Sequence, residues 1–280
     1  MLAIRSMTRA DLDLAVEWAA QEGWNPGLRD ADAFFATDPE GFLLAEHEGE
    51  PVGCISAVRY GDTFGFLGFY IVRPGHRGRG FGLALWRAAM ARFDDRVVGL
   101  DGVVAQQENY RKSGFALVHR NVRYGAARPV APTPASGFTV APITRSSFAE
   151  LAGYDRPFFP APRDAYLRAW ITQPGHVALA LGDGGRLAGY GMIRPCRDGS
   201  KIGPLFADAP EGARTLLAAL LRQAPPGPVF LDLPEPNADA VAMAREAGMA
   251  PVFETARMYT GGAPDLPLAR IYGITSFELG

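Results

Sequence analysis

Hydrophobic and polar residues over positions 1–128 switch between the two-residue period of strands and the longer period of helices. The segment 8–23 has helical spacing, with Thr8 able to cap its start and Gly23 able to end it. The remaining expected elements run in chain order: a strand at 2–8, a helix at 30–39, two strands within 41–61, a strand at 68–72, a helix at 81–93, a strand at 96–104, a helix at 107–114 and a strand at 115–125. This alternation predicts an α+β fold.

The periodic pattern stops at the sequence AARPVAPTPASG, which is rich in proline and small residues and predicts a linker over 129–137. A strand and then a helix are expected again within 138–151. Four landmarks then repeat at an offset of about 135 residues: Gly53 with Gly189, Asp101 with Asp232, Gly114 with Gly248 and Tyr124 with Tyr259. We therefore expect two copies of one unit, at 1–128 and 138–280.

Composition places the chain among soluble globular proteins, with 48% hydrophobic and 21% charged residues in 280. The net charge of −2 argues against nucleic acid as the main partner, because phosphate neutralisation needs clustered Lys and Arg. Two cysteines, Cys54 and Cys196, are too few for a disulfide framework, and the four histidines show no ligand spacing, so no metal is expected. Without a signal-peptide pattern or a membrane-span pattern, the expected location is the cytoplasm and no membrane partner is expected.

The stretch FYIVRPGHRGRGFGLALW, residues 69–86, places glycines and arginines between a strand pattern and a helix pattern. Unpaired backbone N–H groups at a helix start favour an anion, usually a phosphate, and glycine lets the backbone approach it. The glycines at 78, 80 and 82 depart from the dinucleotide-binding fingerprint, and no Gly-Lys-Ser/Thr is present. A solvated surface loop remains an alternative on this stretch alone.

Two blocks together resemble the GCN5-related N-acetyltransferases (GNAT). VRPGHRGRGFG, residues 72–82, resembles the family's acetyl-CoA motif, and NYRKSGF, residues 109–115, resembles its downstream Tyr-x-x-x-Gly-Phe signature. With EGWNPG, GLDGV and the closing GITSFELG, the chain is similar to tandem acetyltransferases whose second half is of the YitH type. The resemblance implies two GNAT-like domains, each a mixed, mostly antiparallel twisted sheet flanked by helices.

The resemblance also implies how acetyl-CoA, the cosubstrate, would bind. The backbone of Tyr70 and Val72 would bond the pantetheine amides, and a backbone N–H near Tyr70 or Ile71 would polarise the thioester carbonyl. The expected cofactor-binding residues are Tyr70, Ile71, Val72, Arg77, Gly78, Arg79, Gly80, Phe81, Gly82 and Asn109.

By the same resemblance, Tyr110 would be the general acid that protonates the departing thiolate, with an ordinary helix residue that anchors the KSGF turn as the alternative. Some relatives have a Glu six residues before Val72, but this chain has Phe66, which cannot accept a proton. Glu46 and Asp101 are therefore the candidate bases, although Asp101 has a rival structural reading because Asp232 echoes it in the second copy. Glu46 has a rival reading too, as a solvated strand residue.

For the acceptor, Trp24 and Asn25 in the loop GWNPG are the expected contacts, with packing of Trp24 under the loop as the alternative. The second copy has DAPEGARTLL where the first has its Gly–Arg motif, and Ala244 where the first has Tyr110. That copy is expected to bind no acetyl-CoA in the usual way, but to shape the acceptor site, to form a homodimer or to bind an effector.

These features together predict an acetyl-CoA-dependent N-acetyltransferase that acts on a primary amine of a small molecule, such as an amino acid, a polyamine or an amino sugar. A protein lysine or N-terminal amine is the alternative with the same chemistry. Two alternatives come from other classes: a catalytically silent acetyl-CoA sensor and a nucleic-acid-binding Arg loop. The net charge of −2 argues against the nucleic-acid alternative.

Overall fold

The computed structural model describes residues 1–144 and 148–280, so part of the strand–helix stretch expected over 138–151 lies outside the described residues. The strands of the first half are β1 (Leu2–Ser6), β2 (Phe42–His47), β3 (Glu50–Tyr60), β4 (Phe64–Val72), β5 (Val97–Val103) and β6 (Ala116–Ala126), and its helices are α1 (Arg9–Gln21), α2 (Asp30–Thr37), α3 (Phe81–Met90) and α4 (Gln107–Lys112). The strands of the second half are β7 (Phe138–Pro142), β8 (Val177–Asp183), β9 (Arg186–Pro195), β10 (Ser200–Ala207), β11 (Val229–Pro234), β12 (Ala250–Tyr259) and β13 (Ile271–Gly273), and its helices are α5 (Phe148–Asp155), α6 (Asp164–Thr172), α7 (Pro210–Leu221) and α8 (Ala238–Glu246).

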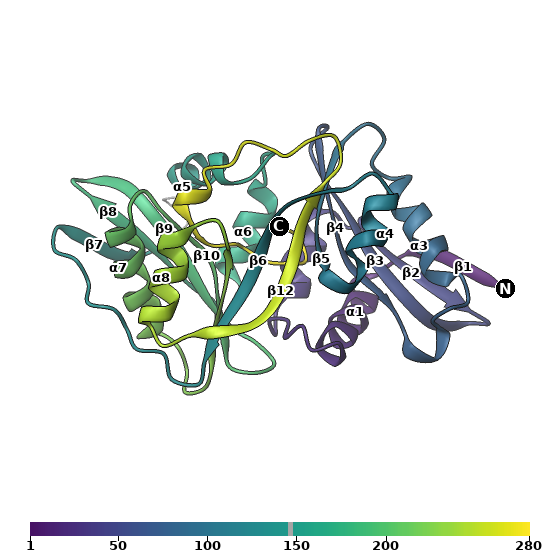
Figure 1. Cartoon of the computed structure of the whole chain (residues 1–280), viewed down its shortest axis with the longest axis horizontal. Coiled ribbons are helices and arrows are strands. Elements are labelled where there is room, and N and C mark those ends of the chain that lie inside the picture. The colour runs from purple at the N-terminus through teal and green to yellow at the C-terminus, as the bar shows by residue number, and fades with distance from the viewer. Residues whose placement is uncertain (145–147) are drawn as a thin grey trace.

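The described strands join into one sheet in the order β1-β2-β3-β4-β5-β12-β6-β11-β10-β9-β8-β7, with β13 beside β10. Within it, β4–β5 and β10–β11 are parallel pairs and the other described pairs are antiparallel. Helices flank each half of the sheet (Figure 1). The predicted α+β class, with a mixed, mostly antiparallel sheet in each half, is confirmed.

The two halves exchange their last long strands. β12, from the second half, pairs with β5 of the first half, and β6, from the first half, pairs with β11 of the second. β6 and β12 also pair with each other, and Figure 1 shows them crossing the middle of the molecule side by side. Each half therefore completes its sheet with a strand of the other half.

A buried carboxylate–guanidinium pair sits at each of the two exchanged contacts. Arg123 on β6 donates two hydrogen bonds to Asp232 on β11, at 2.6 and 2.8 Å, and Arg257 on β12 donates two to Asp101 on β5. All four side chains are at most 7% exposed. Burial would raise the pKa of Asp232, but Arg123 outweighs that effect and lowers it. The echo between Asp101 and Asp232 thus corresponds to equivalent ion pairs.

The glycine landmarks of the repeat also have equivalent surroundings. A Cβ at Gly53 would lie 2.8 Å from the carbonyl oxygen of Ile71 and 3.1 Å from Leu85. A Cβ at Gly189 would lie 2.8 Å from the carbonyl oxygen of Phe206 and 3.1 Å from Leu216. Both copies therefore need a residue without a side chain where the third strand of the unit meets the fourth strand and the following helix.

Helices cover both faces of the sheet in the first half. The apolar faces of α1 and α2 pack on one side, together with α6 of the second half, where the Phe34 and Trp170 rings stack at 5.7 Å. α3, α4 and inward residues of β12 pack on the other side. The fully buried Arg194, on β9, donates to Asp30, on α2, at 2.9 Å, so this interface is both apolar and ionic. The two halves therefore share a core.

The predicted helix at 8–23 is confirmed as α1, which has a reciprocal capping box between Thr8 and Asp11. The predicted linker, 129–137, has no helix or strand and is tied to the second half, since the Val130 N–H donates to the Ala247 carbonyl at 2.9 Å. The domain boundaries themselves stay a prediction, because the sheet is continuous across them.

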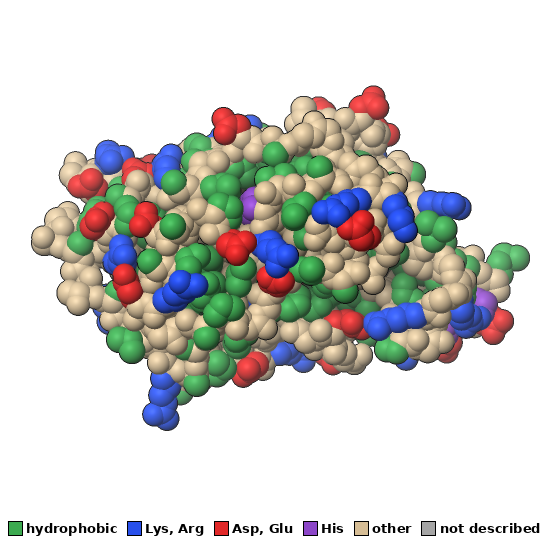
Figure 2. Space-filling view, in the orientation of Figure 1, with side chains coloured by type: hydrophobic (Ala, Val, Ile, Leu, Met, Phe, Trp, Pro, Cys, Tyr) green, Lys and Arg blue, Asp and Glu red, His purple; other side chains and the backbone are tan. Residues whose placement is uncertain are grey.

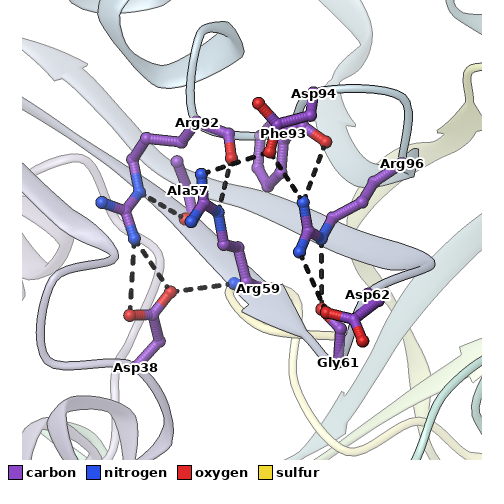
Figure 3. A network of polar contacts seen from close by, with 9 residues as sticks. All are labelled: Asp38, Ala57, Arg59, Gly61, Asp62, Arg92, Phe93, Asp94 and Arg96. Carbon is purple, nitrogen blue, oxygen red and sulfur yellow. Dashed lines mark hydrogen bonds and ion pairs between the residues drawn. The ribbon is translucent and has the colours of Figure 1, made fainter.

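A network of arginines and carboxylates fixes the far end of α3 (Figure 3). Arg92 donates to the Ala57 carbonyl at 3.2 Å and to Asp38 at 3.1 Å, and Asp38 also accepts from the Arg59 N–H at 3.0 Å. Arg96 donates to the Gly61 carbonyl and to Asp94 at 3.1 and 3.0 Å. The turn after α3 is thus tied to β3 and to the β3–β4 turn, which holds the helix in position. Among the described helices, none is long and apolar enough to cross a membrane.

We expect Asp232→Ala to lower the free energy of unfolding by about 3–5 kcal/mol, because it leaves the Arg123 guanidinium buried without its carboxylate. Denaturant unfolding measures this. Asp183→Ala is the control, since Asp183 is half exposed and 3.8 Å from Arg186, and it should leave the unfolding midpoint nearly unchanged. Equal, small effects of the two substitutions would contradict the role given to the exchanged pair.

Candidate active site

The two parallel strands of the first half diverge in mid-course. β4 and β5 pair from Phe64 with Val97 to Leu67 with Leu100, and beyond these residues the two strands do not pair in the part of the chain that the structure describes. Residues 68–72 continue β4 beside β3 alone, so in the described structure their outward backbone groups have no strand partner. A cavity of about 490 Å³ opens in this gap.

The backbone of β4 is irregular where the gap opens. Phe69 has a φ of +46°, and the β3–β4 register shifts between Cys54 and Ser56. A positive φ at a bulky residue is a sparsely populated conformation that the surroundings must enforce. Here the Cys54 thiol donates to the Phe69 carbonyl at 3.2 Å, and the Phe69 ring packs edge-on against Phe34 at 5.7 Å. The irregularity turns the Tyr70–Val72 backbone along the cavity.

The Gly–Arg turn lies at one end of the cavity. Gly80, with a φ of +83°, is the N-cap of α3, so the first-turn N–H groups of α3 lack intrahelical acceptors and point out of the helix start. A Cβ on Gly82 would lie 2.8 Å from the Tyr70 hydroxyl, so a side chain there would crowd this end of the gap. Arg77 lies beside it, donating to the Val72 carbonyl at 2.7 Å and to the Glu22 carboxylate. The helix start, the glycines and the guanidinium together make this end of the cavity suited to an anion.

Aromatic side chains line the middle of the cavity. Trp86 on α3 lies 5.6 Å from the Tyr70 ring and 5.6 Å from the Tyr110 ring. Tyr110 is 7% exposed, and burial, with a smaller effect of nearby Tyr70, raises the pKa of its hydroxyl, which therefore stays protonated at neutral pH. A Cβ on Gly102 would lie 2.2 Å from the Tyr110 ring, so Gly102 provides the space in which this ring sits.

The second half forms the other end of the cavity. Phe253 and Thr255 come from the exchanged strand β12, and Phe277 and Glu278 come from the C-terminal tail, residues 274–280. The tail lies against β4, because a Cβ on Gly68 would come within 2.1 Å of the Glu278 carbonyl oxygen. The cavity is therefore composite: the first half provides the end with the glycine-rich helix start, and the second half provides two aromatic and two polar residues at the other end.

The structure separates the two candidate bases. Asp101 lines the cavity, but its carboxylate accepts from Arg257, from Asn121 at 2.8 Å and from Thr255 at 3.3 Å. Glu46 is not among the residues that line the cavity, and its carboxylate is held by Arg5 at 2.7 Å. Neither carboxylate is thus free toward the cavity, which supports the structural reading of Asp101 and a surface role for Glu46.

Of the expected cofactor-binding residues, those that line the cavity are Tyr70, Ile71, Val72, Arg77, Gly78, Gly80 and Gly82. Arg79 turns away from it and interacts with His47 and His76, at 3.0 and 3.3 Å. Phe81 is buried under Arg79, and Asn109 donates to Gln106 on the surface of α4. The side chains of these three residues thus contact other parts of the first half.

Of the two residues expected to contact the acceptor, Trp24 lines the cavity and Asn25 does not. Trp24 lines the cavity, and its carbonyl accepts from Arg123 at 2.7 Å. Asn25 instead exchanges two hydrogen bonds of 2.9 Å with the Asp198 backbone, and so joins the two halves. The contributions of Phe253, Thr255 and Glu278 to the cavity were missed. The closing GITSFELG was the one signal in the sequence that pointed to the tail.

The corresponding gap in the second half is filled by the chain itself. β10 and β11 pair from Ser200 with Val229 to Ile202 with Leu231 and then diverge. β13 enters there, pairing antiparallel with β10 at Leu205, and the next residue, Ile274, donates its N–H to the Asp232 carbonyl at 2.8 Å. A bound segment of this chain thus occupies the place that is open in the first half.

Comparison with known proteins agrees with this architecture. Residues 9–115 match the model described as the acetyltransferase (GNAT) family, and residues 151–273 match a model described as an acetyltransferase (GNAT) domain. A holothin acyltransferase from Pseudoalteromonas sp. (strain SANK 73390) is 36% identical over 265 residues, covering 94% of this chain and 90% of the relative.

Solved structures show the same fold. A Pyrococcus horikoshii structure described as an acetyltransferase superposes with a TM-score of 0.83 at 24% identity, covering 100% of this chain and 96% of that one. A tandem GNAT protein from the clavulanic acid biosynthesis pathway superposes with a TM-score of 0.66 at 17% identity, covering 95% and 100%.

The diverging strands, the glycine-rich helix start and the repeated unit define a tandem acetyltransferase fold. The chain belongs to the GNAT family of N-acetyltransferases, as two tandem domains, and it is an acyltransferase enzyme.

Because Gly102 leaves room for the Tyr110 ring, we expect Gly102→Ala to force that ring to move and to destabilise the fold by about 1–3 kcal/mol. Thermal unfolding checks this against Gly75→Ala, whose Cβ would meet nothing within 4 Å and which should change the midpoint little. If both variants unfold at the same temperature, the Tyr110 ring is not held as described.

Proposed function

We propose that this enzyme transfers the acetyl group of acetyl-CoA to a primary amine of a small molecule, with Tyr110 as the general acid. The observation that carries the proposal is the composite cavity, which runs from an anion-binding helix start, past a buried tyrosine, to a wall made by the second half.

The residues present fit acetyl-CoA. The unpartnered edge of residues 68–72 offers hydrogen-bonding groups to an extended amide chain, as a neighbouring strand would. The amides at the start of α3 and the Arg77 guanidinium suit a pyrophosphate. When bound, acetyl-CoA supplies a thioester whose carbonyl carbon accepts the amine nitrogen.

The chain's own residues then polarise the thioester carbonyl and supply the proton for the leaving group. A backbone N–H near Tyr70 or Ile71 polarises the thioester carbonyl. Tyr110, which burial keeps protonated, gives its proton to the departing sulfur. The silent-sensor alternative has less support, because a sensor has no need of a buried protonated hydroxyl in the cavity wall.

A small acceptor is favoured over a protein substrate by the way the cavity ends. Phe253, Phe277 and Trp24 form its far wall, and they come from the exchanged strand, the C-terminal tail and the α1–α2 loop.

Charged side chains of both signs alternate over the surface in Figure 2, which gives little basis for recognising a nucleic acid or a highly charged protein segment on that face.

A thiol-release assay with acetyl-CoA and a panel of amino acids, polyamines, amino sugars and lysine peptides tests the proposal. We expect turnover with at least one small-molecule class. Turnover with peptides alone would favour the protein-acetylating alternative, and turnover with none would favour the sensor.

We expect Tyr110→Phe to lower kcat about 100-fold with little change in CoA affinity, because the sulfur loses its proton donor while the binding contacts remain. Steady-state kinetics and calorimetric CoA titration measure the two quantities. Tyr124→Phe is a matched control, since Tyr124 is buried in β6 and does not line the cavity. An unchanged kcat for Tyr110→Phe would remove Tyr110 from the mechanism.

Arg77→Glu should weaken CoA binding about tenfold or more, because a charged hydrogen-bond donor at the anion-binding end becomes an acceptor. Arg87→Glu makes the same charge change on an exposed face of α3, where CoA affinity should be nearly unchanged. Calorimetric titration compares the two, and an equal loss in both would mean that Arg77 acts only through overall charge.

Calorimetry should also give one CoA per chain, because β13 fills the second gap. Two equivalent sites per chain would show that this segment leaves its place on binding.

A further inference from the structure

Glu278, on the C-terminal tail, is one of the residues that line the cavity. Its side chain is among the most deeply buried carboxylates, with the residue 3% exposed. The tail that carries it is fixed along its length: the Tyr60 hydroxyl donates to the Leu279 carbonyl at 3.0 Å, and the Leu279 N–H donates to the Ser276 hydroxyl at 3.1 Å. The backbone beside Glu278 is therefore held in place.

Three carboxylates line the cavity, and two of them already have an arginine partner. Glu22 is paired with Arg77, and Asp101 with Arg257. Glu278 has no ion pair within the part of the chain that the structure describes, and its buried Oε2 has no hydrogen-bond partner there. A buried polar atom without a partner is costly, so this one marks a place where a ligand or solvent group belongs.

The charged groups around Glu278 leave it able to take up a proton. Those that act on it are Lys201 on β10, Asp30 on α2, Arg123 on β6 and Arg194 on β9. Arg123 and Arg194 are committed to Asp232 and Asp30. Burial raises the pKa of the Glu278 carboxyl and lowers the pKa of the Lys201 ammonium group. A carboxyl whose pKa is raised holds a proton more strongly, so its ionised form is a better proton acceptor than an ordinary glutamate.

Glu278 lies close to the point where the cavity begins. The Glu278 backbone touches Gly68, at the point where β4 leaves β5 and the cavity begins. Phe277 precedes it in the same wall. Glu278 therefore belongs to the cavity wall at the place where β4 and β5 part. At the position where some relatives have a Glu, this chain has Phe66, which cannot accept a proton.

We infer that Glu278 is the general base, which takes the proton from the acceptor's ammonium group and so makes its nitrogen nucleophilic. This rests on the proposed function. The nitrogen lone pair forms the bond to the acetyl carbon, and the carbon–sulfur bond breaks with its electron pair going to sulfur. Tyr110 gives its proton to that sulfur and takes back the second proton of the nitrogen, while Glu278 releases the first to solvent. The products are an N-acetyl amide, the free thiol of CoA and one proton.

The pH dependence follows from this role. The base works only when ionised, so kcat/KM of the wild-type enzyme should rise with pH through the Glu278 titration, at a pH above the ordinary glutamate value. In Glu278→Gln that limb should vanish. The remaining activity should rise only as the free amine itself loses its proton.

The test uses the best acceptor found in the amine panel. We expect Glu278→Gln to lower kcat about 100-fold at neutral pH, to lose the acidic limb, and to keep wild-type CoA affinity in a calorimetric titration. Glu40→Gln, at an exposed position outside the cavity wall, should leave all three unchanged. Glu278→Asp keeps the carboxylate one methylene further back, and it should lower kcat while retaining the limb.

The possible outcomes distinguish a wrong assignment of the general base from a wrong assignment of the reaction. An active wild type whose Glu278→Gln variant keeps both kcat and the acidic limb overturns the assignment of the base and leaves the transferase standing. A wild type inactive with every amine overturns the proposed function and the base with it. If Glu278→Gln fails to bind CoA, Glu278→Asp decides: an unchanged kcat there contradicts the assignment.

Discussion

The exchange of β6 and β12 between the halves is the constraint on which the rest of the structure depends. Each exchanged strand carries one arginine of a buried pair, Arg123 with Asp232 and Arg257 with Asp101. A buried charge without its partner is far less stable than the same charge in water, so neither half can withdraw its strand without separating the two charges of a buried ion pair. The repeat is therefore more than a duplication placed end to end, because each copy is completed by the other.

The same diverging-strand gap has two uses in one chain. In the second half β13 occupies it, and it packs closely there, since a Cβ on Gly273 would lie 2.7 Å from the Leu231 side chain. In the first half the gap is open and lined by Tyr110 and the helix start. The tail that follows β13 then runs to the first half, where it brings Glu278 to the cavity. One continuous segment, β13 and the tail after it, thus fills the gap in the second half and contributes lining residues to the cavity in the first half.

Local signals predicted much of this fold, and non-local pairing explains what they missed. Thr8 and Gly80 act through neighbours within a few residues, so the helix starts could be predicted from sequence. The offset of the landmarks revealed the repeat, but which strand β6 pairs with depends on residues more than a hundred positions away. Glu278 was missed for the same reason, because its burial is set by contacts with Gly68 and Tyr60. Glu46 was misleading, since nothing near it in sequence shows that Arg5 holds its carboxylate.

We infer that a single working site is built from both halves. A crystal structure of the protein with CoA and an accepted amine tests this inference most directly. We expect a single CoA between β4 and β5, its pyrophosphate at the start of α3, its sulfur beside the Tyr110 hydroxyl and the amine nitrogen beside the Glu278 carboxylate. A CoA between β10 and β11 in place of β13, or an amine bound away from the second half's wall, would contradict it.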